Sequence, residues 1–335
     1  MRHAVWRRAR RCRVSDAGGF TLVEALVTMG ITVSILGAVF RMLAPARDLF
    51  RSVPEAAELE QRRRYLVQTL GHDIRMAGHG TSEADGAFAY GTAAVLPYRI
   101  GQERSDARAG VHFRHGVLTV AYVPSEPEAT SRAMRSGDRH VMAVSRTYYL
   151  RETAGGSQLM RYDGIVTDAP VLDDVVALSF ELLAEPDPPR LITHDRDGMP
   201  VPPRTTYGPL PPPVGTDVAG DGWAAGENCV FSVLDGAHLS RLPRLSEDRR
   251  LQRLAPEQLI DGPWCTGTTD DEPYDADLLR IRQVHVRATL QARQAFRGAA
   301  GTLFRRAGTA RNAGGLVPDR EVRFDVSPRN LAHGR

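Results

Sequence analysis

Residues 18–24 read Gly-Gly-Phe-Thr-Leu-Val-Glu, and an apolar run from Phe20 to Phe40 begins within this stretch. Glu24 is the only ionisable side chain in that run. A helix of this length spans about 31 Å, which is enough to cross the hydrocarbon core of a bilayer. An ionised carboxylate costs on the order of 2–3 kcal/mol at the centre of such a helix and less near its end, so it usually has a partner. The stretch therefore predicts a membrane helix that carries a carboxylate in need of a cation.

The nearest cation that the sequence offers to Glu24 is an α-amine. A cut between Gly19 and Phe20 would create an amine about one turn from Glu24, and in an assembly the amine of a neighbouring subunit could serve instead. One acid, Asp16, and six arginines precede the apolar run: Arg2, Arg7, Arg8, Arg10, Arg11 and Arg13. By the positive-inside rule, this asymmetry predicts a cytoplasmic N-terminus and an exported C-terminal bulk.

This pattern resembles the N-terminus of type IV prepilins, which is also found in type II secretion pseudopilins. The matching residues are Gly19 at the cleavage point, Phe20 as the new and N-methylated first residue, and Glu24 as the fifth residue of the mature chain. The resemblance implies that prepilin peptidase removes residues 1–19. It also implies that Glu24 pairs with the Phe20 amine of a neighbouring subunit and so sets the axial register of an assembly.

Two ordinary alternatives compete with prepilin processing. Ala44-Pro45-Ala46 offers a site for cleavage of a secretory signal peptide, and the apolar run could be a plain membrane anchor. The run is longer than the apolar region of a typical signal peptide and contains Glu24, which favours the prepilin interpretation.

Charge and composition exclude several classes of function. The formal net charge is +3, but the leader contributes +5 of it, which leaves the mature chain at −2. The charge therefore gives no support for nucleic-acid binding. The chain has no lysine, so a Walker A loop, a Schiff base and pyridoxal-phosphate chemistry are all excluded.

Two of the three cysteines, Cys229 and Cys265, remain after removal of the leader. In an exported protein such a pair most simply forms a disulfide, and closing a loop of this length stabilises the fold by roughly 4 kcal/mol in the chain-entropy model. The alternative is a pair of unbonded core thiols. Because no paired histidines lie near, a zinc site is disfavoured.

The helical pattern continues after the apolar run. Apolar residues recur at the helical period, with charged residues on the other face and glycines after the end: Leu59, Leu66, Leu70, Ile74 and Ala77; Glu58, Glu60, Arg63, Arg64 and Asp73; Gly78 and Gly80. We therefore expect one long helix with a transmembrane half over 20–44 and an amphipathic half over 45–80. The segment Asp73–Gly78 resembles the end of this helix in PilW-type minor pilins, and the length of the chain favours that type over the shorter J-type pseudopilins.

Residues 81–335 are predicted to form a β-rich domain. Strands are expected over 116–123, 141–151, 158–162, 175–183, 279–290 and 322–326. In the fourth of these, the set that begins with Val176, Leu178 and Phe180 should face inward, and in the fifth the alternation slips near Gln283. Strands with turns and few helical patterns indicate an antiparallel sheet, so the predicted fold class is α+β, with a pilin-like long helix packed on that sheet.

Residues 184–230 interrupt the strand pattern with a proline-rich segment. Ten of the 22 prolines lie between Pro186 and Pro213. The composition predicts a surface excursion that is partly polyproline-like, and either a partner-binding loop or a tolerated insertion explains it.

Catalytic and metal-binding patterns are weak. No Gly-x-Ser-x-Gly, His-Glu-x-x-His or Cys-x-x-Cys motif occurs, and His112 and His115 would face opposite sides of a strand. Asp195–Gly198 resembles a fragment of a calcium loop that lacks its closing glutamate. A denser acidic cluster contains Asp270, Asp271, Glu272, Asp275 and Asp277. It is a weak candidate for Ca²⁺, which some pseudopilins bind, and a solvated acidic loop is the alternative.

The sequence thus predicts a structural subunit, with no enzymatic activity and no cofactor. As the resemblance implies, its partners are prepilin peptidase, other minor and major pilins or pseudopilins, and the inner-membrane assembly platform. It would cross the inner membrane once, with its C-terminal domain in the periplasm, before it enters a type IV pilus. A type II secretion pseudopilin of the J-like kind and a membrane-anchored periplasmic enzyme are the alternatives.

Overall fold

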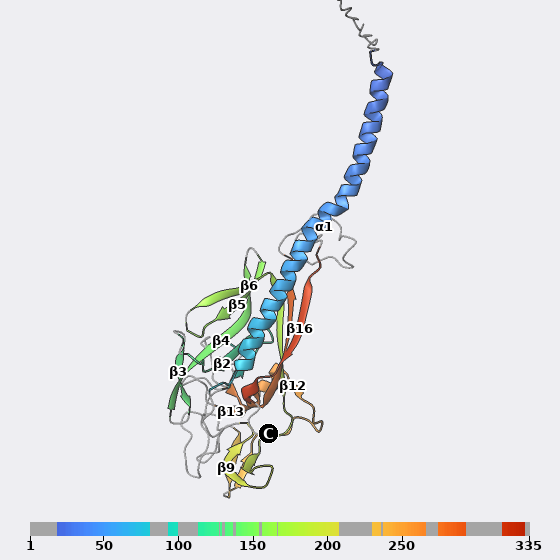
Figure 1. The fold of residues 1–335 in the computed structure, drawn as a ribbon. Coiled ribbons are helices and arrows are strands. Elements are labelled where there is room, and N and C mark those ends of the chain that lie inside the picture. Colours follow the sequence, from blue (N-terminus) through green and yellow to red (C-terminus); the bar gives the residue numbers. More distant parts are fainter. Residues whose placement is uncertain are drawn as a thin grey trace, which may run out of the picture. The chain divides into compact units, whose positions relative to one another are not determined.

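The computed structural model of the chain describes residues 19–80, 93–99, 113–126, 128, 131–136, 139–153, 156–165, 167–207, 230–235, 237–265, 274–292 and 317–331. The chain divides into two compact units, Met1–Ser52 and Val53–Arg335. The first unit contains the apolar part of a long helix, and the second contains the rest of that helix together with the β-sheets (Figure 1). The predicted leader lies outside the described residues except for Gly19.

A single helix, α1, runs from Leu22 to Met76. It begins two residues after the predicted start and ends four residues before the predicted end, and it passes through both Pro45 and Pro54. The halves predicted from the change in composition are therefore one element. The turns after Met76 are built by Gly78 and Gly80, both at positive φ.

The amphipathic pattern of the second half of α1 is confirmed. Leu66, Leu70, Ile74 and Ala77 are fully buried, and Leu59 is nearly so. They join a core to which both main sheets contribute. In Figure 1, strands of the first sheet and β16 of the second lie on either side of this part of the helix. One charged residue departs from the prediction: Asp73, assigned to the polar face, is buried.

Two antiparallel sheets contain most of the strand residues that the structure describes in the second unit. The first has the order β1-β2-β4-β5-β6, with β3 paired to β4, and the second has the order β12-β7-β15-β16. The first sheet consists of β1 (Val95–Leu96), β2 (Leu118–Tyr122), β3 (Arg132–Ser136), β4 (Arg139–Thr153), β5 (Gly156–Tyr162) and β6 (Asp168–Asp173). The second consists of β7 (Val175–Ala184), β12 (Gln252–Leu254), β15 (Ile281–Leu290) and β16 (Arg320–Val326). The α+β class with an antiparallel sheet is confirmed.

The remaining elements are short. Two-stranded sheets pair β8 (Leu191–His194) with β9 (Pro200–Thr205), β10 (Phe231–Leu234) with β11 (Ala237–Ser240), and β13 (Trp264–Cys265) with β14 (Tyr274–Asp275). Short 3-10 helices occur at η1 (Pro256–Ile260), η2 (Ala276–Arg280) and η3 (Arg329–Leu331).

Strands β7 and β15, both predicted from their alternation, form the centre of the second sheet. Leu178, Phe180 and Leu182 are buried, and the register shifts between Ile281 and Gln283, where the slip is expected. A second shift, next to Leu290, was not predicted. Because of this shift, Val175 is buried and Val176 is only half-buried. At that end of β7 the inward-facing residue is therefore Val175, and not Val176 as predicted.

The described part of the proline-rich segment corrects the prediction of a polyproline-like excursion. Residues 191–205 form the β8–β9 hairpin, in which Leu191 pairs with Thr205. The hairpin tolerates prolines because a two-stranded sheet has edge positions whose N–H groups are not needed for pairing. Residues 208–229 lie outside the described residues.

Candidate functional site

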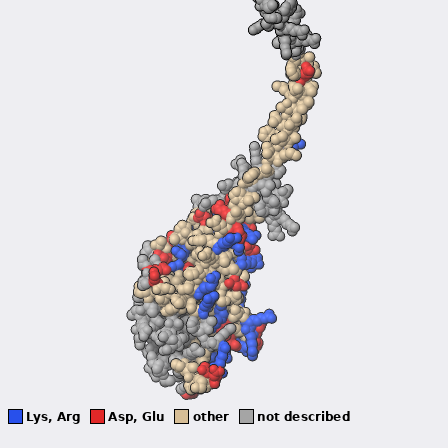
Figure 2. Space-filling view, in the orientation of Figure 1, with Lys and Arg blue, Asp and Glu red and all other residues tan. Residues whose placement is uncertain are grey.

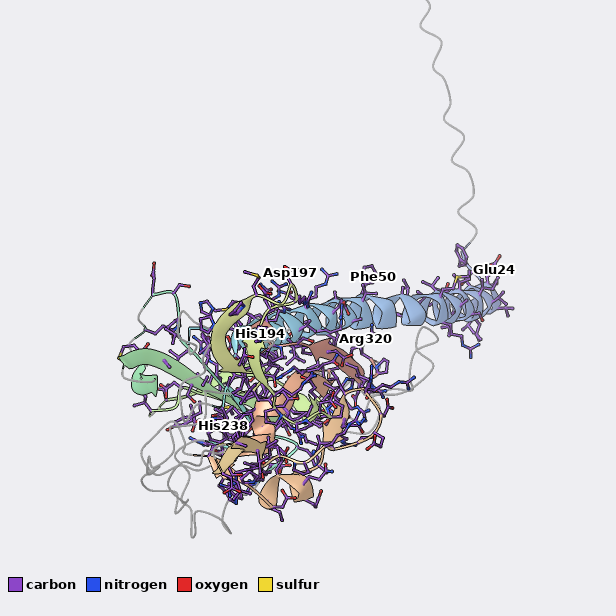
Figure 3. All side chains as sticks on the ribbon, turned by 90° about the horizontal axis from the view of Figure 1, so that it is seen from below. Glu24, Phe50, His194, Asp197, His238 and Arg320 are labelled. Atoms are coloured by element: carbon purple, nitrogen blue, oxygen red, sulfur yellow. The ribbon has the colours of Figure 1, made fainter. Side chains whose placement is uncertain are left out.

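The side chains of Thr21 and Glu24 cap the N-terminus of α1. Glu24 Oε2 accepts hydrogen bonds from the backbone N of Thr21 at 3.1 Å and from its Oγ1 at 3.0 Å. The backbone N of Glu24 donates to Thr21 Oγ1 at 3.3 Å. This reciprocal arrangement is a capping box, which satisfies donors that the first turn of a helix leaves free. Figure 3 labels Glu24 at this end of α1.

The capping box adds a role for Glu24 that the sequence analysis missed, although Thr21-Leu22-Val23-Glu24 has the required Thr-x-x-Glu spacing. Both bonds from Thr21 go to Oε2, so Oε1 accepts no hydrogen bond from the part of the chain that the structure describes. Phe20, next to the cap, is 81% exposed. The carboxylate can therefore cap its own helix and still present one oxygen to another group.

The first part of α1 is long and apolar enough to cross a membrane. The candidate span is Leu22–Leu43, with a mean hydropathy of 2.0. Its hydroxyl groups bond back to the helix: Thr28 Oγ1 donates to the carbonyl of Glu24 at 2.9 Å, and Ser34 Oγ donates to that of Gly30 at 2.8 Å. Polar groups of this segment thus find partners within the helix, which a hydrocarbon environment requires.

Near its other end, α1 is held to the first sheet through Asp73, which is 2% exposed. Its carboxylate accepts hydrogen bonds from the hydroxyls of Tyr148 at 2.5 Å and Tyr122 at 3.2 Å. Arg146 Nη1 lies 3.4 Å from Asp73 Oδ2, and Arg146 Nη2 donates to Glu128 at 2.9 Å. Burial, and then the Asp73 carboxylate, raises the pKa of Tyr148, so its hydroxyl stays protonated and donates. The network explains why a buried charge is tolerated there.

The segment Asp73–Gly78 also ends the helix. The backbone N of Gly78 donates to the carbonyl of Ala121 at 2.9 Å, which joins the end of α1 to β2. Asn330 Nδ2 lies 3.4 Å from the carbonyl oxygens of Arg75 and Met76, where the last turn leaves acceptors free. The residues that carry the PilW-type resemblance therefore have structural roles in this chain. Asp73 anchors the helix, Ile74 and Ala77 belong to the core, and Gly78 forms the turn.

Part of the predicted acidic cluster lies beside a carboxylate that the sequence analysis did not include. Asp261, Asp275 and Asp277 bring one oxygen each to within 4.8 Å of one another. Asp275 accepts hydrogen bonds from the backbone N of Gly262 at 3.0 Å and of Asp277 at 2.7 Å. Arg280, fully buried, donates to Asp277 at 2.6 Å and also to the carbonyl of Pro243. Asp270, Asp271 and Glu272 lie outside the described residues.

These contacts favour a structural role over a cation site. Both carboxylate oxygens of Asp275 already accept backbone hydrogen bonds, one from Gly262 and one from Asp277. Burial, and then the nearby Asp277 and Asp261 carboxylates, raises the pKa of Asp275 to about 8. The guanidinium of Arg280 already supplies a cation to Asp277. Calcium prefers six to eight oxygen ligands, and this group offers three carboxylates of which two are engaged.

The other predicted residues are placed separately. Asp195 Oδ1 accepts hydrogen bonds from the backbone N atoms of Asp197 and Met199, so the fragment that resembles a calcium loop is the turn of the β8–β9 hairpin. Cys265 is buried. Cys229 lies outside the described residues, as does His112, so the pairing of Cys265 with Cys229 stays a prediction.

Comparison with known proteins finds one pilin-like relative that is similar over part of the chain. The chain is 42% identical over 60 residues to the pilin-like protein PilA3 of Thermus thermophilus. The match covers 18% of the chain and about a quarter, 26%, of PilA3.

Two further comparisons add little. No protein-family model matches the chain. A solved type IV-like pilin from Thermus thermophilus aligns with 83% of the chain and 98% of its own length, at 11% identity and a TM-score of 0.29. At that TM-score the likeness carries no argument about fold or function.

Proposed function

We propose that the chain is a PilW-type minor pilin, a structural subunit that is processed by prepilin peptidase and then enters or primes a type IV pilus. The observation that carries the proposal is the junction at residues 19–24, where Gly-Phe and a capping Glu24 stand at the start of a helix apolar enough to span a membrane. The similarity to a pilin-like protein supports it. A large domain of its own suits a rare tip or priming subunit better than a repeated shaft subunit.

In this proposal Glu24 acts by charge pairing after cleavage. The new Phe20 amine of a neighbouring subunit binds the free Oε1, while Oε2 keeps the bonds to Thr21. A pair of this kind offsets the cost of a carboxylate among apolar helices and fixes the axial position of one subunit against the next.

Processing is tested by the N-terminal sequence and mass of the membrane-bound protein. We expect a mature chain that begins with N-methylated Phe20. A mature start at Arg47 would instead identify a secretory signal peptide, and an intact leader would identify a plain anchor.

Two variants separate helix capping from charge pairing at Glu24. Glu24→Gln keeps an acceptor at the capping position but removes the charge, whereas Thr21→Val removes the hydroxyl and keeps the charge. We expect Glu24→Gln to be cleaved and to remain in the membrane but to be lost from filaments, measured as the amount of the subunit in sheared filaments. Thr21→Val should retain most incorporation. Equal incorporation of Glu24→Gln and the parent would contradict the pairing role.

A type II secretion pseudopilin of the J-like kind would use the same N-terminal chemistry. The two differ in the filament that they join, so co-purification with pilus subunits or with secretion-channel components distinguishes them. We place the pilus first because the Asp73–Gly78 segment resembles the PilW type.

A further inference from the structure

The exposed face of α1 in the second unit carries a groove rich in arginine. The groove has a volume of about 420 Å³, and six residues of α1 line it: Arg63, Arg64, Val67, Gln68, His72 and Arg75. We call these six residues the arginine groove. In Figure 2, basic side chains gather over the region where Figure 1 shows this part of α1 and β16. The opposite face of the helix is buried in the core, so this face is the one left for a partner.

Four residues of the groove form a stripe along the helix axis. Arg64, Gln68, His72 and Arg75 follow one another at intervals of four, four and three residues. At 100° per residue they lie within a sector of about 80°, and the stripe is about 16 Å long. A partner that presents groups at the same spacing along its own axis, such as another helix, matches this geometry.

The guanidinium of Arg75 lies close to the backbone of Gly71. A Cβ at position 71 would lie 2.9 Å from Nη2 of Arg75, so a larger residue would displace that guanidinium. Glycine is unfavourable inside a helix, and here its absence of a side chain lets Arg75 lie against the helix surface.

The positive charge of the groove is only partly neutralised. Glu60 lies 2.6 Å from Arg63 and 3.8 Å from Arg64, whose side chain is 77% exposed. Arg75 has no carboxylate partner among the residues that the structure describes. Among the residues that the structure describes, no acid lines the groove.

We propose that the arginine groove binds an acidic helix face of a different subunit of the same filament. This inference rests on the proposed function, in which long helices of neighbouring subunits pack side by side. Pairing of two copies through the same face would set arginine against arginine, which is unfavourable, so the partner is not a second copy in a symmetric contact. Nucleic acid is disfavoured because the mature chain is acidic overall and Glu60 stands beside the groove.

A defined peptide tests the groove in solution. The probe is a fluorescent helical peptide with glutamates four, four and three residues apart, and the control peptide carries glutamine at those positions. Full-length protein in detergent should bind the acidic peptide and not its control, and more weakly as salt is raised. The double variant Arg64→Gln/Arg75→Gln should lose about tenfold or more in affinity, and Gly71→Ala should weaken binding through Arg75 alone.

Arg196→Gln is the matched control, because Arg196 is exposed on the β8–β9 turn outside the groove. It should leave binding unchanged. The proposal would be overturned if the protein bound the two peptides equally, or if Arg196→Gln lost as much affinity for the acidic peptide as the groove variant. It would also be overturned if the protein bound a DNA duplex of matched charge more tightly than the acidic peptide and the groove variant abolished that binding.

A photo-crosslinking residue at position 68 tests the partner in cells. The expected product joins this chain to another filament subunit at a helical peptide that carries carboxylates, and Arg64→Glu/Arg75→Glu should abolish it. Normal incorporation of that charge-reversed variant would overturn the groove proposal and leave the proposed function standing. If the parent chain is not cleaved after Gly19, the proposed function fails, and the peptide measurement still decides whether the groove binds an acidic helix.

Discussion

Two carboxylates of α1, Glu24 and Asp73, do different work because their surroundings differ. The Glu24 carboxylate is exposed at the first turn and accepts hydrogen bonds only from Thr21 in the described part of the chain. Asp73 is buried and accepts from two tyrosine hydroxyls beside Arg146. The first has an oxygen to offer to another subunit, and the second is fully committed to holding the helix on its own domain.

Removal of the Asp73 carboxylate should destabilise the second unit. Asp73→Ala leaves the buried Tyr148 hydroxyl without its acceptor and weakens the hold on Arg146, which we expect to cost about 3 kcal/mol. Tyr148→Phe removes one donor only and should cost about 1 kcal/mol. Chemical unfolding of the detergent-solubilised chain measures both. Asp197→Ala, on the exposed hairpin, is the control, and an equally small effect of Asp73→Ala would show that the network does not stabilise the fold.

Asp275 should make stability depend on pH between about 4 and 8. Its pKa is raised from 3.8 to about 8 in the folded chain, so the folded state holds a proton that the unfolded state releases. Stability from this group is therefore complete at low pH and falls as pH rises through that window. Burial raises the pKa of Asp277 as well, which acts in the same direction.

The slope of melting temperature against pH from 5 to 8 measures this effect. Asp275→Asn, which cannot ionise, should give a flatter slope than the parent, and Asp197→Asn should leave the slope unchanged. The slopes are compared, and not the melting temperatures themselves, because the asparagine amide keeps only one of the two acceptor oxygens of Asp275. The variant therefore loses a hydrogen bond at every pH. Parallel curves for Asp275→Asn and the parent would rule out Asp275 as the source.

At the scale of elements, the turn after α1 depends on a glycine that also fits closely against Val123, the residue that follows β2. Gly80 has φ of +68°, and a Cβ there would lie 2.6 Å from Cβ of Val123. Gly198, in the β8–β9 turn, has φ of +79° and no atom within 4 Å of the same position. The two glycines share a backbone requirement and differ in the space around them.

We expect Gly80→Ala to lower stability more than Gly198→Ala. Both substitutions force alanine into the left-handed region, at about 1–2 kcal/mol, and only the first adds a clash with a β-branched side chain. Melting temperatures of the two variants measure the difference. A smaller loss for Gly80→Ala would mean that the turn after α1 rearranges without cost.

The same scale shows why some strands could be predicted and others could not. Strands β7 and β15 are long and buried, so their alternation and the slip near Gln283 are visible in the sequence. The β8–β9 hairpin contains prolines and mostly exposed residues, and its pairing has no such pattern. Burial imposes a periodicity on the sequence, and a small exposed hairpin does not need one.

At the scale of the whole molecule, the predicted disulfide between Cys229 and Cys265 would join two distant segments. If the two are paired, Cys265→Ser and the double variant with Cys229→Ser should lower the melting temperature equally, because either change breaks the same bond. Peptide mapping without reduction provides an independent measurement. Additive losses, or alkylation of both cysteines in the unreduced chain, would exclude the pair.

The sequence by itself determined the α+β fold class of this protein, the apolar span at the start of its long helix and the apolar stripe of the second half. A membrane span, the Gly19-Phe20 junction, the position of Glu24 and the apolar stripe of the second half depend on local order and periodicity, which a single chain displays directly. The capping box was equally local, and it lay in the Thr-x-x-Glu spacing.

Only the tertiary structure decided what the charged residues do. Asp73 has the helical position of a surface residue, and it is buried because Tyr122, Tyr148 and Arg146 from the sheet converge on it. In the sequence, Asp275 and Asp277 are only two members of an acidic run. In the structure, backbone amides donate to Asp275 and Arg280 donates to Asp277. Periodicity indicates which face of an element is apolar, but the partners of a charge come from residues far away in the chain, and folding alone brings them together.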